Sequence, residues 1–294
     1  MTIAACYLCS EGVVLGADST STMFVFGPGD SGGSYHHFDF AQKLFELGDD
    51  STAGIVTWGL GSLGSVSYRT LIAEVADASD RAADLERIAA CWSDRFWKQY
   101  THSFGSYLER ARLLRAKSVR TEEEGRELTF LWDTFSGGFC IGGRWGKQRS
   151  PCAYEILFDP LRTEPPEPTQ LQTGHARFWG CPNLIERVLY GIDENLFGAV
   201  AESKWWTGTK EDLLELVAPN MLSQPQDLPL REAIDWVFAS VYTTIKAMKF
   251  SHLAPVCGGG IEVAVITSDR PFRWVRHKSL GEAIAASVPG RDWL

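Results

Sequence analysis

Short apolar runs separated by polar turns open the chain. Residues 2–9 and 13–19 are apolar, and the polar residues 10–12 between them end in a glycine, which tolerates positive φ. Residues 43–47 and 53–58 flank a second polar turn in the same way. The first part of the chain is therefore predicted to form two β-hairpins.

A helical pattern replaces the short runs from about residue 65. Apolar residues spaced three and four apart continue to about residue 117, with a break near residues 78–80, which predicts two consecutive helices. The clearest helix is expected over residues 229–249, directly after a proline. Further strands are predicted at 137–145, 153–158, 261–267 and 272–275, and helical stretches near 183–190 and 209–218.

The predicted elements occur in groups: strands, helices, strands, helices, strands. Grouping of this kind suits helix layers that cover antiparallel sheets better than alternating parallel β-α-β units. We therefore predict an α+β fold, a four-layer αββα sandwich of two antiparallel sheets, in a single domain over residues 1–294.

Composition narrows the possible partners. The formal net charge is −9 and no Lys/Arg-rich run occurs, which argues against binding to nucleic acid or to an anionic membrane surface. No apolar stretch approaches the roughly 18 residues of a membrane span, and a cytoplasmic protein is expected. The seven cysteines are scattered, so reduced thiols are expected. Cys6 and Cys9 form a C-x-x-C on a predicted strand, where residues three apart point to opposite faces.

Candidate chemistry begins at the N terminus. Thr2 follows Met1, and a small second residue normally allows the initiator methionine to be removed. Thr2 would then carry both a hydroxyl and a free α-amine, whose pKa of about 7.7–8.0 suits a general base. Asp18 ends the first hairpin and Lys43 opens the second. A lysine near Thr2 would lower the pKa of the nucleophile, and a carboxylate would hold that lysine in place.

The segments T-I-A, G-V-V-L-G-A-D-S and Q-K-L-F-E-L resemble the start of a proteasome β subunit, in order and spacing, over residues 2–47. The resemblance implies the fold of the N-terminal-nucleophile hydrolases and a threonine peptidase or amidohydrolase. It implies Thr2 as nucleophile, Asp18 and Lys43 as its charged partners, and the backbone N–H of Gly59 as the oxyanion hole. Substrate-binding residues implied in the same way are Ser19, Thr20, Ser21, Thr22, Thr57 and Gly61.

The same resemblance implies a peptide or small amide as substrate, no metal or other cofactor, and a homo-oligomeric ring. It leaves open whether an ATPase partner is needed. The chain also departs from the family. Its supporting serine and aspartate fall on Cys257 and Ala254, another serine falls on Cys181, and extra residues lie near 20–40, 101–135 and 160–228. These departures favour the alternative of a non-catalytic structural ring subunit, whereas Thr2, Asp18 and Lys43 together favour the enzyme.

Two other motifs carry competing interpretations. Residues 59–64 fit G-x-G-x-x-G after a predicted strand, but a second helix rather than a parallel strand is predicted to follow, which argues against a dinucleotide site. His36 and His37 are adjacent, and adjacent residues do not readily chelate one metal ion. A solvated loop pair is the simpler interpretation.

Overall fold

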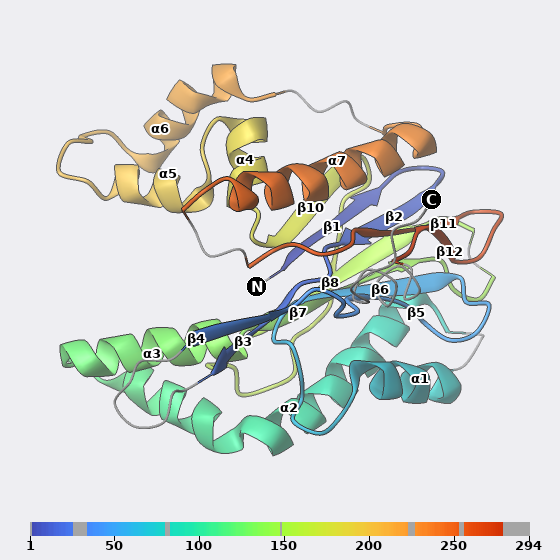
Figure 1. The fold of residues 1–294 in the computed structure, drawn as a ribbon, viewed down its shortest axis with the longest axis horizontal. Helices are drawn as coiled ribbons and strands as arrows, with labels where there is room; N and C mark the ends of the chain where they lie inside the picture. Colours follow the sequence, from blue (N-terminus) through green and yellow to red (C-terminus); the bar gives the residue numbers. More distant parts are fainter. Residues whose placement is uncertain are drawn as a thin grey trace, which may run out of the picture.

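The computed structural model describes residues 2–25, 34–79, 83–147, 149–222, 227–252 and 256–278. These residues form four layers, helices on sheet on sheet on helices (Figure 1). The α+β fold with two antiparallel sheets between helix layers is therefore confirmed.

The first sheet contains the N-terminal hairpin in its interior. Its strand order is β10-β1-β2-β11-β12, and every described pairing is antiparallel. The central position of β1 and β2 explains why both strands read as continuous apolar runs. The strands are β1 (Ile3–Leu8), β2 (Gly12–Ala17), β10 (His175–Gly180), β11 (Glu262–Thr267) and β12 (Arg273–Arg276).

The second sheet stacks on the first and has the order β5-β6-β7-β8-β9, again antiparallel. Its strands are β5 (Leu44–Glu46), β6 (Ala53–Gly59), β7 (Gly137–Gly143), β8 (Cys152–Phe158) and β9 (Thr169–Gln170). A separate hairpin joins β3 (Ser21–Val25) to β4 (Ser34–Phe38). Trp58 of β6 stacks on Trp179 of β10, with ring centroids 4.4 Å apart, and so connects the two sheets.

The helices divide between the two outer faces (Figure 1). The long helix α7 packs on β1 and β2, and α4 packs on α7. On the other face, α2 packs on β7 and β8 and also contacts α1 and α3. The first group is α4 (Asn183–Tyr190), α5 (Glu194–Ala201), α6 (Lys210–Val217), η1 (Ala218–Asn220) and α7 (Leu230–Lys249); the second is α1 (Tyr68–Ala78), α2 (Leu85–Ala116) and α3 (Glu122–Phe135). None of the helices in the described part of the chain combines the length and apolar character that crossing a membrane requires.

Alternation along β1 divides its side chains between two cores. Ile3, Ala5 and Tyr7 pack in the cluster beneath α7. Cys6 packs between the two sheets, whereas Cys9 packs beneath α7. The C-x-x-C cysteines therefore point to opposite faces, as the strand pattern predicts.

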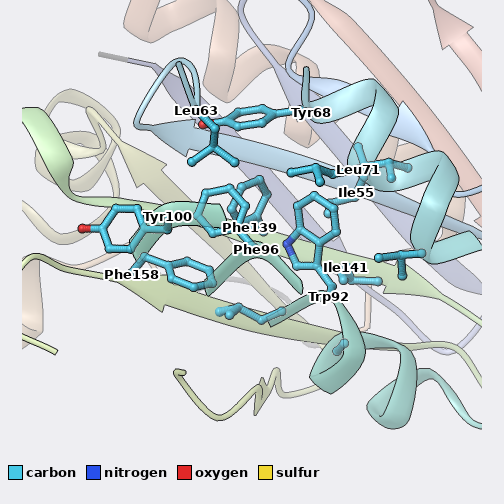
Figure 2. Close-up of a cluster of buried hydrophobic side chains, with 14 of the residues drawn as sticks. Ile55, Leu63, Tyr68, Leu71, Trp92, Phe96, Tyr100, Phe139, Ile141 and Phe158 are labelled. Carbon is cyan, nitrogen blue, oxygen red and sulfur yellow. The ribbon is translucent and has the colours of Figure 1, made fainter. Parts of the chain in front are cut away.

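An aromatic cluster fills the space between α2 and the second sheet (Figure 2). Phe96 of α2 lies 4.6 Å from Phe139 of β7 and 4.5 Å from Phe158 of β8, measured between ring centroids. Trp92 meets Phe139 edge-on at 4.9 Å. Tilted and edge-to-face geometries of this kind suit the quadrupoles of aromatic rings and fix how α2 sits on the sheet.

Several elements were not predicted by the apolar pattern, namely α3, α5, β3, β4, β9 and β10. In β10, an edge strand, only Ala176 and Trp179 are buried, and they lie on opposite faces of the sheet. A strand of six residues with only two buried apolar positions gives a weak signal. Within 160–228, where extra residues are expected, β10 forms part of the first sheet.

Candidate active site

Asp18 is the centre of the site. Its side chain is fully buried just after β2 and accepts hydrogen bonds from several groups. Oδ1 accepts from the backbone N–H of Ile3 at 3.1 Å and from Lys43 Nζ at 2.7 Å. Oδ2 accepts from the backbone N–H of Thr20 at 3.2 Å and of Gly258 at 2.9 Å. A buried carboxylate is stable only with partners of this kind, and these four donors satisfy both oxygens of Asp18.

Lys43 is the charged partner of Asp18. It lies directly before β5 and is almost completely buried. Its carbonyl oxygen accepts a hydrogen bond from the N–H of Thr57 at 2.9 Å, which ties its backbone to β6. Since Lys43 and the N–H of Ile3 share one oxygen of Asp18, the ammonium group lies close to the backbone of the residue after Thr2. Asp18 and Lys43 are therefore in direct contact beside the start of β1, at the residue that follows Thr2.

Thr2 is held at the start of β1 and is only 3% exposed. Gly180 lies opposite Ile3 in the β1–β10 ladder and has φ of +85°. A Cβ at Gly180 would overlap the carbonyl oxygen of Thr2, so only glycine allows this approach. The backbone of Thr2 is thereby fixed from two sides, by Asp18 through Ile3 and by β10.

A pair of thiols lies beside Thr2, and one of them, Cys181, contacts the nitrogen of Thr2. The backbone N–H of Thr2 and the thiol of Cys257 both donate hydrogen bonds to Cys181 Sγ. The bond from Cys257 lowers the pKa of Cys181, more than burial raises it, and the N–H of Thr2 lowers it further. The same bond, together with burial, raises the pKa of Cys257. Both thiols stand where the resemblance leads one to expect supporting groups; the third such position, Ala254, lies outside the described residues.

The predicted substrate segment falls into two parts. Ser19 and Thr20 are buried and lie against the 256–260 turn, with Ser19 Oγ donating to the carbonyl of Gly260 at 2.6 Å. Ser21 and Thr22 belong instead to β3. Thr22 Oγ1 is hydrogen-bonded to Nδ1 of His37 at 3.0 Å, which gives His37 a structural partner across the hairpin.

Gly59 and Gly61 belong to the other side of the predicted site. Gly59 has φ of +76° and a Cβ there would overlap β7, so glycine is required for the close approach of the two strands. The nearest atom to a Cβ at Gly61 would be Ser21 Oγ, at 3.6 Å. The described contacts thus join Gly59 to β7 and Gly61 to Ser21 rather than to Thr2. After Gly59 the chain continues through helices to β7, which pairs antiparallel with β6. A dinucleotide site would need a parallel strand beside β6, so the glycines of residues 59–64 do not form one here.

A second buried charge cluster lies beside Asp18 and was not predicted from the sequence. Glu262 is fully buried opposite Ala17, and its carboxylate meets His277 Nδ1 at 2.8 Å and Lys278 Nζ at 3.3 Å. Lys278 Nζ also donates to the carbonyl of Ala41 at 2.7 Å. Burial lowers the pKa of Lys278, against the effect of Glu262. One acidic residue inside the apolar run I-E-V-A-V-I was the available signal.

A surface hollow lies elsewhere, over β8 and the Pro-rich segment after it. Glu155, Arg162, Pro165 and Thr169 are among its lining residues, and none of the predicted site residues lines it. The buried ion pair at Asp18 is the stronger mark of a chemical site, because its donors converge on one carboxylate.

Comparison with known proteins leaves the family open. No protein-family model matches the chain, and no curated protein is detectably similar to it in sequence. Among solved structures, the chain is similar to the Anbu (Gly-1) mutant from Hyphomicrobium sp. strain MC1. The two are 13% identical, the match covers 100% of each chain, and the TM-score is 0.45. Likeness at this level assigns no activity.

Proposed function

We propose that the protein is an N-terminal threonine hydrolase that cleaves a peptide or small amide after removal of Met1. The observation that carries the proposal is the shared Oδ1 of Asp18, which brings the ammonium of Lys43 to the backbone beside Thr2. A protein that needs only a stable core gains little from a buried ion pair at this position, because desolvation offsets much of the attraction. The proteasome-like order of T-I-A, Asp18 and Lys43 in the sequence supports the same function.

In the proposed reaction the α-amine of Thr2 accepts the proton of its own hydroxyl as Oγ1 attacks the substrate carbonyl. The positive charge of Lys43 favours the deprotonated oxygen. Collapse of the tetrahedral intermediate breaks the C–N bond, and the leaving amine takes the proton. Water then hydrolyses the acyl ester and restores Thr2. By resemblance, the N–H of Gly59 stabilises the oxyanion.

The second candidate is a non-catalytic subunit of a homo-oligomeric ring. The thiols at Cys181 and Cys257 favour it, since they stand where the resemblance expects serines. Both candidate functions predict a homo-oligomeric ring, which light scattering and electron microscopy of the purified protein would detect.

Covalent labelling of the mature protein tests the enzyme. Intact mass should show a chain that begins at Thr2, and a peptide epoxyketone should label it, because ring closure uses the hydroxyl and amine of one residue. Thr2→Ala should abolish labelling. Lys43→Met should slow it by about 10²–10³-fold, the usual effect of removing one electrostatic stabiliser. The exposed Lys249→Met is the matched control and should label normally.

Two results would support the ring subunit instead. One is retention of Met1 in protein isolated from its native cell, since a blocked amine has no role as a base. The other is a mature chain that takes no label at Thr2 while circular dichroism shows it folded.

A further inference from the structure

Cys181 and Cys257 come together from distant parts of the chain, and Cys181 contacts the nitrogen of Thr2. Cys181 follows β10 and Cys257 precedes β11, and they are 5% and 3% exposed. Cys257 donates a hydrogen bond to Cys181, which also accepts the N–H of Thr2. Gly258, the neighbour of Cys257, donates to Asp18 at 2.9 Å. The thiol pair therefore belongs to the same contact network as the proposed nucleophile.

A second thiol pair in the chain serves as a natural comparison. Cys6 of β1 and Cys140 of β7 are hydrogen-bonded to each other between the two sheets. Both are almost completely buried among apolar side chains, and burial raises the pKa of Cys140 well above its usual value. All seven cysteines are thiols rather than disulfides. The two pairs share burial and contact but differ in their neighbours.

We propose that Cys181 and Cys257 are a reversible oxidation site, at which a peroxide converts the two thiols into a disulfide that switches Thr2 off. The switching effect rests on the proposed function of Thr2, whereas formation of the disulfide does not. Disulfides in reducing compartments are usually transient and redox-sensing, which is the behaviour proposed for this pair.

The neighbours of Cys181 make it the attacking thiol. Hydrogen bonds from Cys257 and Thr2 stabilise its thiolate, and removal of Met1 would place a positive α-amine beside the same sulfur. The thiolate attacks one peroxide oxygen, the O–O bond breaks, and hydroxide leaves to take up a proton as water. Cys257 then attacks the sulfenic sulfur; the S–S bond forms, the S–O bond breaks, and a second water leaves. One hydrogen peroxide is reduced for two thiols oxidised.

The disulfide removes the partner of the Thr2 nitrogen. In the reduced state Cys181 Sγ accepts a hydrogen bond from that nitrogen, and a thiolate is a strong acceptor. A disulfide sulfur is neutral, is a weaker acceptor, and must move to the S–S bond length of about 2.05 Å. The α-amine of mature Thr2 then loses the group that orients it, so it no longer meets its own hydroxyl in the productive geometry.

The first experiment treats reduced, Met1-free protein with hydrogen peroxide. Remaining thiols are alkylated after unfolding, and peptides are analysed without reduction. We expect a Cys181–Cys257 cross-linked peptide, formed at least about tenfold faster than any oxidation of Cys6 or Cys140, because thiolate availability controls the rate. If peroxide consumes the thiols of Cys181 and Cys257 no faster than those of Cys6 and Cys140, the proposal is overturned.

The second experiment follows Thr2. Epoxyketone labelling should fall about tenfold on oxidation, as expected for one lost charge-assisted hydrogen bond, and return with dithiothreitol. Cys257→Ser should stop the reaction at a sulfenic acid on Cys181, trapped by dimedone, whereas Cys91→Ser on the surface of α2 should still form the disulfide. Labelling that persists through disulfide formation would overturn the switch. A disulfide that forms in a protein with no label in either state would instead overturn the function of Thr2.

Discussion

The surroundings of Asp18 and the aromatic cluster under α2 are equally buried but are built on different physics. Phe96 contacts Phe139 and Phe158 through surfaces that many arrangements of similar volume would satisfy. Asp18 needs each of its donors at a hydrogen-bond distance, because an unpaired buried charge is far more costly than a lost apolar contact. One region holds the layers together, and the other fixes positions to within fractions of an ångström.

The difference predicts that stability and labelling of Thr2 separate in the two regions. A change in the aromatic cluster should lower stability and leave the geometry at Thr2 intact. A change at Asp18 should lower both. Three substitutions test this separation, taken from the largest expected effect to the smallest.

Asp18→Asn should have the largest effect. It removes the charge that pairs with Lys43 and turns an amide toward groups that only donate, so the free energy of unfolding should fall by about 3–5 kcal/mol. Labelling of Thr2 should also fall, by about 10²-fold or more, because Lys43 loses its anchor. Urea unfolding and labelling rates check this, with the exposed Asp235→Asn on α7 as control. Normal labelling of a destabilised Asp18→Asn would refute the role of the carboxylate.

Phe96→Ala should lower the free energy of unfolding by a similar amount, about 3–5 kcal/mol, through the cavity left between Phe139 and Phe158. Labelling of the folded protein should be unchanged. Phe130→Ala is the matched control, because Phe130 of α3 is 47% exposed. A parallel loss of labelling, measured at a temperature where the variant is folded, would show that the two regions are coupled.

Gly180→Ala should have the smallest effect on stability and still reduce labelling. Positive φ at an alanine costs about 1–3 kcal/mol, and relief of the overlap with Thr2 requires β1 and β10 to move apart. Labelling should fall about tenfold or more, since small displacements of a nucleophile are costly. Gly198→Ala in α5 has open space at its Cβ and serves as the control. Unchanged labelling in Gly180→Ala would mean that the start of β1 adapts freely.

The sequence predicted the long elements well because their patterns are local. The hairpin at 2–19 and the helix at 229–249 correspond closely to β1, β2 and α7. The strand β10 was not predicted because an edge strand buries few residues. Its place beside β1 also depends on pairing across more than half of the chain. The sequence of residues 175–180 has no periodic pattern that indicates β1 as the partner.

The candidate site was predictable only where its residues carry a motif. Thr2, Asp18 and Lys43 were predicted from flanking segments that resemble those of a family, and the structure pairs Asp18 with Lys43 beside the residue that follows Thr2. The contact between Cys181 and Cys257 was not predictable, because the sequence around each cysteine contains no motif that indicates the other as its partner. To predict the ion cluster of Glu262 and Lys278, one would have to know which face of the strand lies beside Asp18.

The contact between Gly258 and Asp18 also sets an order of events during synthesis of the protein. The two residues are 240 positions apart, so the hydrogen-bond network around Asp18 is completed only after nearly the whole chain has left the ribosome. Thr2 is 3% exposed in the completed fold. Under the proposed function, removal of Met1 is therefore expected before this network closes. The pairing of β1 with β10 and of β11 with β2 is distant in sequence, and topologies of this kind fold slowly, which would leave time for that step.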